Sequence, residues 1–140
     1  MTIALIDDCP QDLALLSEYV CRYCNEHKIH ASVKQFSHEK DFENILDTEH
    51  YDLVFLDIFM QDSNGILIAK KLKRISPKCQ IIFSTSSKEH AVKAFRLHAL
   101  DYLLKPYTYA QFEDALDRYE NTVNKFTHYI ELKEGYLMTR

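Results

Sequence analysis

The chain has 140 residues, a hydrophobic fraction of 46% and a formal net charge of −4. This length suits one domain, and the apolar content is sufficient for a packed core. Lys and Arg are not clustered, so the domain by itself is not expected to bind nucleic acid, which requires grouped cations. No apolar run reaches the roughly 18 residues of a membrane span, and the first residues do not form a signal peptide. Both features predict a cytoplasmic protein without membrane contact.

The first half of the chain shows two strand–helix units. Residues 3–6 form a continuous apolar run, as in a buried parallel strand, and Pro10 suits the first turn of a helix because its missing N–H costs nothing there. Apolar residues at helical spacing continue this helix to about His27. Residues 31–36 indicate a second, weaker strand, and Ser37 is a plausible N-cap for a short helix. The inward side chains of that short helix are expected to be Phe42, Ile45 and Leu46.

Three further units follow. Their strands are predicted at residues 53–56, 81–83 and 102–104. A helix after the first of these strands ends at Ser76–Pro77, and another runs through Ala91 and Ala94 to Phe95. Thr108 and Gln111 form a capping-box pattern at the start of the last helix. That helix has apolar residues at helical spacing, namely Phe112, Ala115, Leu116, Tyr119 and Val123.

Alternation of strands and helices predicts an α/β fold. Five strand–helix units imply a five-stranded parallel sheet with helices on both faces. The length requires short connections, which favours the flavodoxin-like, doubly wound arrangement with strand order 2-1-3-4-5. The order rests on size alone, because the sequence does not fix which strands are neighbours.

Polar residues stand where the predicted strands end. Asp7 and Asp8 follow the first strand, Asp57 follows the third, Thr85 lies at the end of the fourth, and Lys105 follows the fifth. In an open parallel sheet the carboxyl ends of all strands lie at one edge, where ligands bind. A single Asp after a strand is often only a helix cap, but five such residues at one edge predict a pocket.

The chemistry of this set is that of phosphoryl transfer. Three crowded carboxylates resist ionisation unless a cation compensates them, and oxygen ligands without a complete protein cage suit Mg²⁺. An Asp can act as a nucleophile and take a phosphoryl group as an acyl phosphate. Lys105 and the metal would offset charge on the phosphoryl oxygens, and Thr85 would donate a hydrogen bond to one of them.

Four stretches resemble the receiver domains of bacterial response regulators along residues 1 to about 124. They are IALIDD, VFLDIFMQDSNG, IIFSTS and ALDYLLKPY. The resemblance implies a signalling switch that accepts a phosphoryl group on Asp57 from a sensor histidine kinase. Such a receiver promotes only its own phosphorylation and dephosphorylation and is not otherwise an enzyme.

The same resemblance assigns roles to individual residues. It implies that Mg²⁺ is bound by Asp7, Asp8, Asp57 and the backbone carbonyl of Phe59. Thr85 is implied as the switch hydroxyl, Tyr102 as the switch aromatic and Lys105 as the site lysine, with a cis bond between Lys105 and Pro106. A homodimer through the fourth helix, fifth strand and fifth helix is also implied.

Two positions depart from the family pattern. Gln61 stands where proline is usual, and His98 stands where a small residue is usual before the fifth strand. Neither residue belongs to the predicted phosphorylation chemistry, so the assignment of that chemistry is unaffected.

The pairing of LDI with ALDYLLKPY, together with the segment AVKAF, resembles regulators that carry a LytTR-type (LytR/AgrA-like) DNA-binding domain. The tail from Thr127 to Arg140 contains YIELKEGYLMTR, which alternates like a strand and turns at Glu134–Gly135. We therefore expect residues 1–124 to form the receiver. Residues 125–140 would form a linker and the start of a truncated LytTR-type domain, through which alone DNA would be bound. The alternative is a stand-alone receiver that acts through protein contacts.

A haloacid-dehalogenase-type phosphatase is the main rival from another class of protein. It also uses a strand-end Asp nucleophile and Mg²⁺, but it needs a second acid two residues later to protonate the leaving group. Phe59 occupies that position and cannot transfer a proton. A P-loop or dinucleotide site is disfavoured because the chain has only two glycines.

Overall fold

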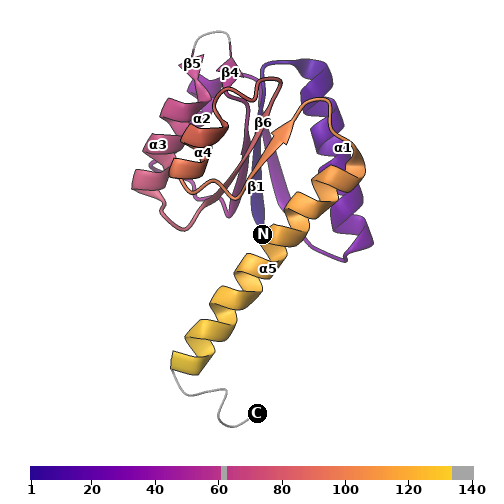
Figure 1. The fold of residues 1–140 in the computed structure, drawn as a ribbon, viewed down its shortest axis with the longest axis vertical. Coiled ribbons are helices and arrows are strands. Elements are labelled where there is room, and N and C mark those ends of the chain that lie inside the picture. The colour runs from indigo at the N-terminus through magenta and orange to yellow at the C-terminus, as the bar shows by residue number, and fades with distance from the viewer. Residues whose placement is uncertain (61–62, 134–140) are drawn as a thin grey trace.

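A five-stranded parallel sheet forms the centre of the molecule. The computed structural model describes residues 1–60 and 63–133. Its main sheet contains β1 (Thr2–Ile6), β2 (Ser32–Phe36), β3 (Leu53–Leu56), β6 (Gln80–Thr85) and β7 (Asp101–Leu104). The order across the sheet is β2-β1-β3-β6-β7, with parallel pairing throughout (Figure 1). Counted along the chain this is the order 2-1-3-4-5, so the predicted doubly wound α/β fold is confirmed.

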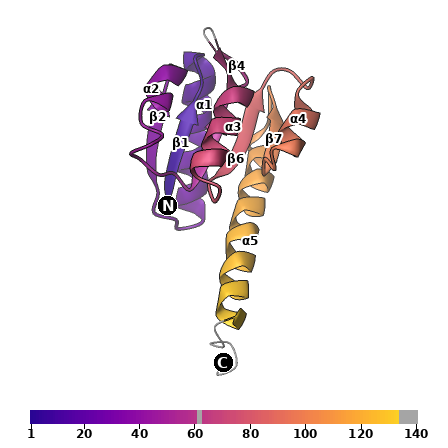
Figure 2. The ribbon, with the colours of Figure 1, turned by 90° about the vertical axis from the view of Figure 1, so that its left-hand side faces the viewer.

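Helices cover both faces of this sheet. They are α1 (Pro10–Glu26), α2 (Glu39–Glu43), α3 (Gly65–Ile75), α4 (Ala91–Arg96) and α5 (Tyr109–Lys133). Helices α1 and α5 lie on one face, and α2, α3 and α4 lie on the other (Figures 1 and 2). Successive side chains of a strand point to opposite faces, so each strand serves both cores. In β1, Ile3 and Leu5 pack on the side of α1 and α5. Ala4 and Ile6 pack on the opposite side.

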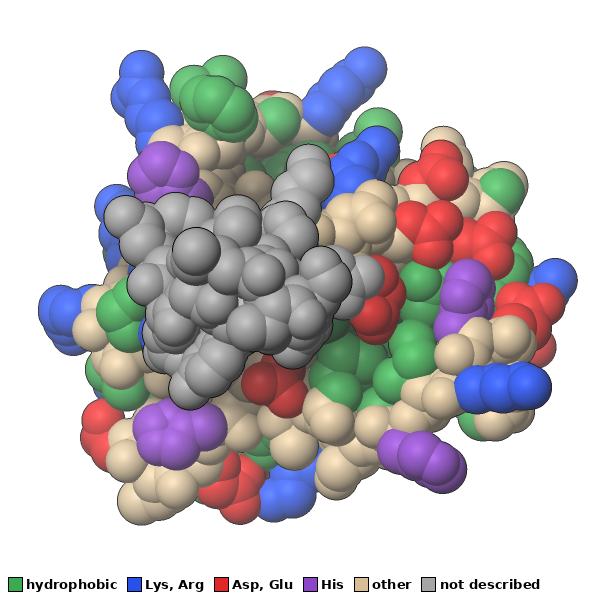
Figure 3. All heavy atoms as spheres, turned by 90° about the horizontal axis from the view of Figure 1, so that it is seen from below, with side chains coloured by type: hydrophobic (Ala, Val, Ile, Leu, Met, Phe, Trp, Pro, Cys, Tyr) green, Lys and Arg blue, Asp and Glu red, His purple; other side chains and the backbone are tan. Residues whose placement is uncertain are grey.

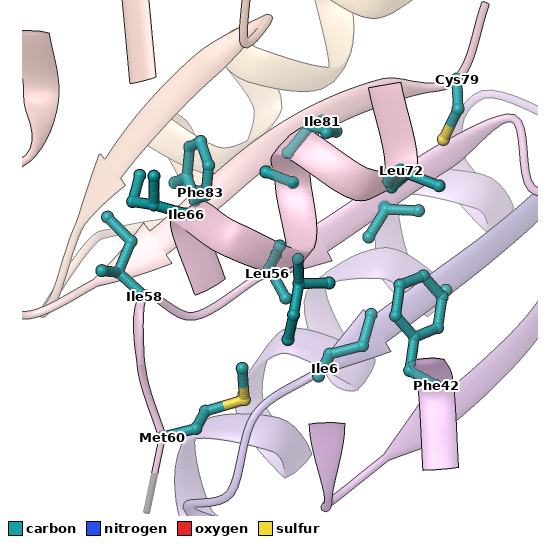
Figure 4. Packing of buried hydrophobic residues seen from close by; sticks show 14 of the residues in the cluster. Ile6, Phe42, Leu56, Ile58, Met60, Ile66, Leu72, Cys79, Ile81 and Phe83 are labelled. Carbon is teal, nitrogen blue, oxygen red and sulfur yellow. The ribbon is translucent and has the colours of Figure 1, made fainter. Parts of the chain in front are cut away.

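The core on the side of α2 and α3 is drawn in Figure 4. Ile6, Leu56 and Phe83 come from three neighbouring strands, and Phe42 and Leu72 come from the helices above them. Every residue of β3 is buried, as expected for a parallel strand that is covered on both faces. Packing on both faces therefore fixes the register of the strands. The register in turn determines which residues lie at the carboxyl edge of the sheet.

A small antiparallel ribbon leads from β3 to α3 and was not predicted. It pairs β4 (Phe59–Met60) with β5 (Ser63–Asn64), where the sequence indicated only a loop. The Asn64 side chain caps α3 by accepting a hydrogen bond from the Ile66 amide at 2.8 Å. The Gly65 amide donates to the Ile58 carbonyl at 2.8 Å. The start of α3 is thereby tied to the segment that follows Asp57.

The local signals for helix starts were partly right. The capping box at α5 is confirmed, because the Thr108 amide donates to Gln111 Oε1 at 2.8 Å and the Gln111 amide donates to Thr108 Oγ1 at 3.2 Å. The prediction of Ser37 as an N-cap is wrong, since α2 begins at Glu39 with His38 at the capping position. His98 adopts a left-handed φ of 58°, which explains why a small residue is usual there.

The tail differs from its prediction. Helix α5 continues to Lys133 and projects beyond the sheet, so the strand expected after Thr127 is wrong up to that residue (Figure 1). Extending an existing helix adds a hydrogen bond for each residue fixed, whereas an isolated two-stranded hairpin is marginal in water. The rest of the predicted hairpin, at residues 134–140, lies outside the described residues.

Two properties of the structure bear on membrane and nucleic-acid binding. Within residues 1–60 and 63–133, no helix has both the length and the apolar character that a bilayer crossing requires. At the end from which α5 projects, the visible Lys and Arg side chains are scattered among acidic and hydrophobic ones (Figure 3). That visible surface does not concentrate the positive charge that phosphate binding needs.

Gly65 provides a test of the packing next to Asp57. A Cβ atom at Gly65 would lie 2.2 Å from the Asp57 carbonyl oxygen and 2.9 Å from Ile58 Cα. Gly65→Ala should therefore destabilise the protein by about 1–3 kcal/mol. An unhindered Gly→Ala change inside a helix would instead stabilise by about 1 kcal/mol.

Urea unfolding of the purified proteins measures this difference. The matched control is Leu67→Ala on the same helix, where the side chain is 62% exposed and the change should stay within about 0.5 kcal/mol. A Gly65→Ala protein as stable as the unsubstituted chain would show that the backbone relaxes without cost.

Candidate functional site

Backbone hydrogen bonds align the predicted site residues at the carboxyl edge of the sheet. The Asp7 amide donates to the Phe36 carbonyl at 3.1 Å, which continues the β1–β2 pairing by one residue. The Asp57 amide donates to the Ile6 carbonyl at 3.1 Å, and the Lys105 amide donates to the Thr85 carbonyl at 2.8 Å. The strand pairings therefore place these residues side by side, as the sequence predicted.

Three carboxylates meet at this edge. Asp7, Asp8 and Asp57 each offer one carboxylate oxygen, and these oxygens lie within 4.8 Å of one another. Asp7 and Asp57 are buried, whereas Asp8 is partly exposed. A hard divalent cation such as Mg²⁺ takes oxygen ligands in this arrangement and keeps several waters. The donor set fits Mg²⁺ in its chemistry.

Lys105 links this cluster to the start of α1. Its Nζ atom lies 2.7 Å from Asp7 Oδ2, 3.1 Å from Asp57 Oδ2 and 2.9 Å from Asp12 Oδ2. Asp12 was not predicted as a site residue. The available signal was its position in the first turn of a helix that starts directly after Asp8, and hence close to the same edge of the sheet.

Burial and charge act against each other in this cluster. Burial raises the pKa of the Asp7 carboxyl above its ordinary value, and the hydrogen bond from Lys105 opposes that increase. Burial lowers the pKa of the Lys105 ammonium, but its hydrogen bonds to Asp7 and Asp12 and the charge of Asp57 outweigh burial and raise it. Lys105 thus stays charged. The single positive charge of Lys105 does not balance the carboxylates of Asp7, Asp8, Asp12 and Asp57. The remaining negative charge favours the binding of another cation.

Thr85 and Tyr102 meet around the loop between β6 and α4. The Thr85 side chain is fully buried, and its Oγ1 atom accepts a hydrogen bond from the Ser87 amide at 3.5 Å. The Tyr102 ring packs against Phe83 with 6.2 Å between centroids, and its hydroxyl donates to the Ser87 carbonyl. Tyr102 and Thr85 therefore both contact the backbone of Ser87, in the loop that follows β6.

Phe59 lies between the cluster and α4. Its amide donates to Asp57 Oδ1 at 3.2 Å, while its side chain is 49% exposed. The Phe59 ring meets the His90 ring edge to face, with 5.2 Å between centroids. Within the described residues, His90 Nδ1 is buried without a hydrogen-bond partner. The ring of Phe59 is thus held against the residue that precedes α4.

A strand-end aspartate with two further acids, a buried threonine and a lysine on a doubly wound parallel sheet defines a phosphoryl-accepting signalling domain. Comparison with known families supports this class. The family model for the response regulator receiver domain matches residues 3–117. The chain belongs to the response regulator receiver domain family.

Two similar proteins of staphylococci are both described as LytR. The chain is 46% identical over 92 residues to the sensory transduction protein LytR of Staphylococcus haemolyticus, and the match covers 66% of this chain and 33% of that protein. It is 34% identical over 96 residues to the transcriptional regulatory protein LytR of Staphylococcus aureus, with 64% and 39% covered. The chain thus spans between a third and two fifths of the length of these relatives.

Solved structures agree with the fold. The response regulatory domain of mrkE from Klebsiella pneumoniae has a TM-score of 0.80 at 28% identity, over 89% of this chain and 99% of that one. The BeF3-activated receiver domain of DrrB, a protein of Thermotoga maritima, has a TM-score of 0.69 at 27% identity, over 86% and 97% of the two chains.

Proposed function

We propose that this chain is the receiver of a cytoplasmic two-component response regulator and accepts a phosphoryl group on Asp57 from a sensor histidine kinase. The observation that carries the proposal is the position of Asp57, whose carboxylate lies among two further acids and the ammonium of Lys105. In the reaction, an Asp57 oxygen forms a bond to phosphorus while the bond from phosphorus to the kinase histidine breaks. The chain would act as a switch and would catalyse only its own phosphorylation and dephosphorylation.

The residues around Asp57 suit each part of this reaction. Mg²⁺ would be held by Asp7, Asp8, Asp57 and the Phe59 carbonyl, and when bound it would neutralise charge on the phosphoryl oxygens. Lys105 would offset the remaining charge from the side of α1. Thr85, buried at the end of β6, would move toward the phosphoryl group and donate its hydroxyl hydrogen to a phosphoryl oxygen.

Phosphorylation can be tested with a small-molecule donor. Incubation with acetyl phosphate and Mg²⁺ should add one phosphoryl group, seen by intact-mass measurement, and removal of Mg²⁺ with a chelator should prevent it. Asp57→Asn should abolish the addition, and Asp8→Asn should reduce it strongly, because each removes a carboxylate of the cluster. The matched control is Asp47→Asn, at an exposed acid away from this edge. Labelling that persists in Asp57→Asn would place the acceptor elsewhere.

The proposed output of the switch is a change in the face made by α4, β7 and α5. Among the side chains that the structure describes, α4 and β7 expose Val92 at 63%, Phe95 at 79% and Leu104 at 39%. Tyr102 connects this face to the loop that follows Thr85. An exposed apolar patch of this kind suits a two-fold contact with a second receiver.

Sedimentation with and without beryllofluoride, which stands in for the phosphoryl group, tests the proposed dimer. The mass should double when beryllofluoride and Mg²⁺ are present. Phe95→Glu should prevent this by placing a charge in the contact, and Leu67→Glu, at an exposed apolar residue on α3, should not. Equal masses in both states would reject the dimer and leave the phosphorylation site unaffected.

Phe59 is proposed to prolong the phosphorylated state. Hydrolysis needs a water in line with phosphorus, and an apolar ring next to Asp57 can shield this approach without orienting a water. The ring contacts His90 edge to face, which fixes it next to Asp57 and supports shielding. Ser87 is small and polar and opposes this effect weakly, because its hydroxyl accepts from the Glu89 amide at 3.2 Å and keeps its hydrogen for a water.

Phe59→Asn should therefore shorten the lifetime of the phosphoryl group. One excluded water can change a rate by one or two decades, which corresponds to roughly 1.4–2.8 kcal/mol. Loss of phosphoryl label at equal Mg²⁺ concentration measures the rates. Phe59→Leu is the matched control, since it keeps an apolar side chain and should preserve most of the lifetime. Equal rates for Phe59→Asn and the unsubstituted chain would show that the ring does not shield phosphorus.

We further propose that the receiver is connected to a DNA-binding output domain. Residues 1–124 would form the receiver, and residues 125–140 would form a linker that leads to a LytTR-type DNA-binding domain. The similarity to proteins described as LytR, one of them a transcriptional regulatory protein, supports this arrangement. Because α5 is helical to Lys133, the connection would begin as a continuous helix. A coding sequence after Arg140 without a basic, strand-rich segment would contradict the DNA-binding output and favour a stand-alone receiver.

A further inference from the structure

Every donor of the Lys105 ammonium has a carboxylate partner. A lysine ammonium has three N–H donors and no acceptor. The three oxygens within hydrogen-bond distance belong to Asp7, Asp57 and Asp12, at 2.7, 3.1 and 2.9 Å. A phosphoryl oxygen that approaches Lys105 from outside this set must therefore displace one of the three partners.

The three partners differ in exposure. The side chains of Asp7 and Asp57 are 2% and 9% exposed, whereas that of Asp12 is 40% exposed. Removing a partner from a buried carboxylate leaves an uncompensated charge away from water, which is costly. A carboxylate at the exposure of Asp12 can be solvated when it is released, so the loss is small. Asp12 is the partner that Lys105 can give up most easily.

A cavity adjoins the contact between Asp12 and Lys105. It has a volume of about 300 Å³ and is lined by both residues together with Leu15, Ser86, Pro106 and Tyr107. Solvent can enter there, so Asp12 has room to move away from the ammonium without disturbing the packed face of α1. That packed face is formed by Leu13, Leu16 and Val20.

We propose that Asp12 is a positioning residue that occupies the third donor of Lys105 in the resting state and yields it to a phosphoryl oxygen. This inference rests on the proposed phosphorylation of Asp57. The exchange moves one N–H hydrogen bond from Asp12 Oδ2 to the phosphoryl group, and no proton is transferred. Asp12 therefore opposes phosphoryl binding, and its removal leaves Lys105 with a donor ready for the incoming anion.

Asp12 also has a structural role that is independent of Lys105. An acid in the first turn of a helix is stabilised by the helix dipole, whatever its side chain contacts. The double variant Gln11→Asp/Asp12→Ala keeps the net charge and the first-turn acid. It moves the carboxylate by about 100° around the helix axis, onto an exposed position and away from Lys105.

The experiment measures beryllofluoride affinity of the 140-residue chain by NMR at saturating Mg²⁺. Asp12→Ala and the double variant should both bind beryllofluoride about fivefold more tightly than the unsubstituted chain does. Asp12→Glu keeps a carboxylate at this position, so its affinity should be close to that of the unsubstituted chain. Glu18→Gln is the matched control, because it removes an exposed acid from the same helix, and its affinity should not change. In the absence of ligand, the Lys105 ammonium resonance should shift in both variants that lack the Asp12 carboxylate, which a purely structural role would not produce.

The outcomes separate this inference from the function on which it rests. If the unsubstituted chain does not bind beryllofluoride, the proposed receiver function fails and the role of Asp12 fails with it. If that chain binds but the double variant has the same affinity, Asp12 does not compete for Lys105, and the receiver function stands. Tighter binding by Asp12→Ala alone would reduce the effect to net charge and would also overturn the exchange.

Discussion

The ion-pair network of Lys105 is the interaction on which the carboxyl edge of the sheet depends. Asp7 and Asp57 are buried side by side, and two ionised carboxylates in that position require a cation. Lys105, which follows β7, provides this cation and forms ion pairs with Asp7 after β1 and Asp57 after β3. The same ammonium reaches Asp12 at the start of α1, so one side chain joins three segments that are far apart in the sequence. The site is largely a product of sheet topology, because its residues stand at the ends of β1, β3, β6 and β7, and α1 adds Asp12.

This dependence explains why most of the site could be predicted from the sequence. Parallel strands end at a common edge, so residues directly after apolar runs had to meet once the five strands were recognised. Asp7, Asp57 and Lys105 needed no further information. Asp12 lies on a helix, where the direction of a side chain depends on rotation about the helix axis. That rotation is set by packing against the sheet, which a single sequence does not show.

The elements that could not be predicted are those whose structure depends on tertiary context. The β4–β5 ribbon has only two residues in each strand, too few for a periodic pattern. Ser37 is a good capping residue, but α2 is a single short turn whose start is set by burial of Phe42. The end of α5 was misjudged because its residues satisfy the alternation of a strand and the spacing of a helix, and continuation of an existing helix prevailed.

One set of contacts links Asp57 to the start of α4, and a second links Thr85 to Tyr102, which favours an output face at α4 and β7. The Phe59 amide donates a hydrogen bond to the Asp57 carboxylate, and the Phe59 ring packs edge to face against the His90 ring. Thr85 lies at the end of β6, and the Ser87 backbone that contacts its hydroxyl is also held by Tyr102. Helix α4 has only six residues, and within it Ala94 alone is buried, so few apolar contacts oppose its displacement. A change in hydrogen bonding at Asp57 would therefore act on a helix with few buried apolar contacts, which is a property of segments with low local stability.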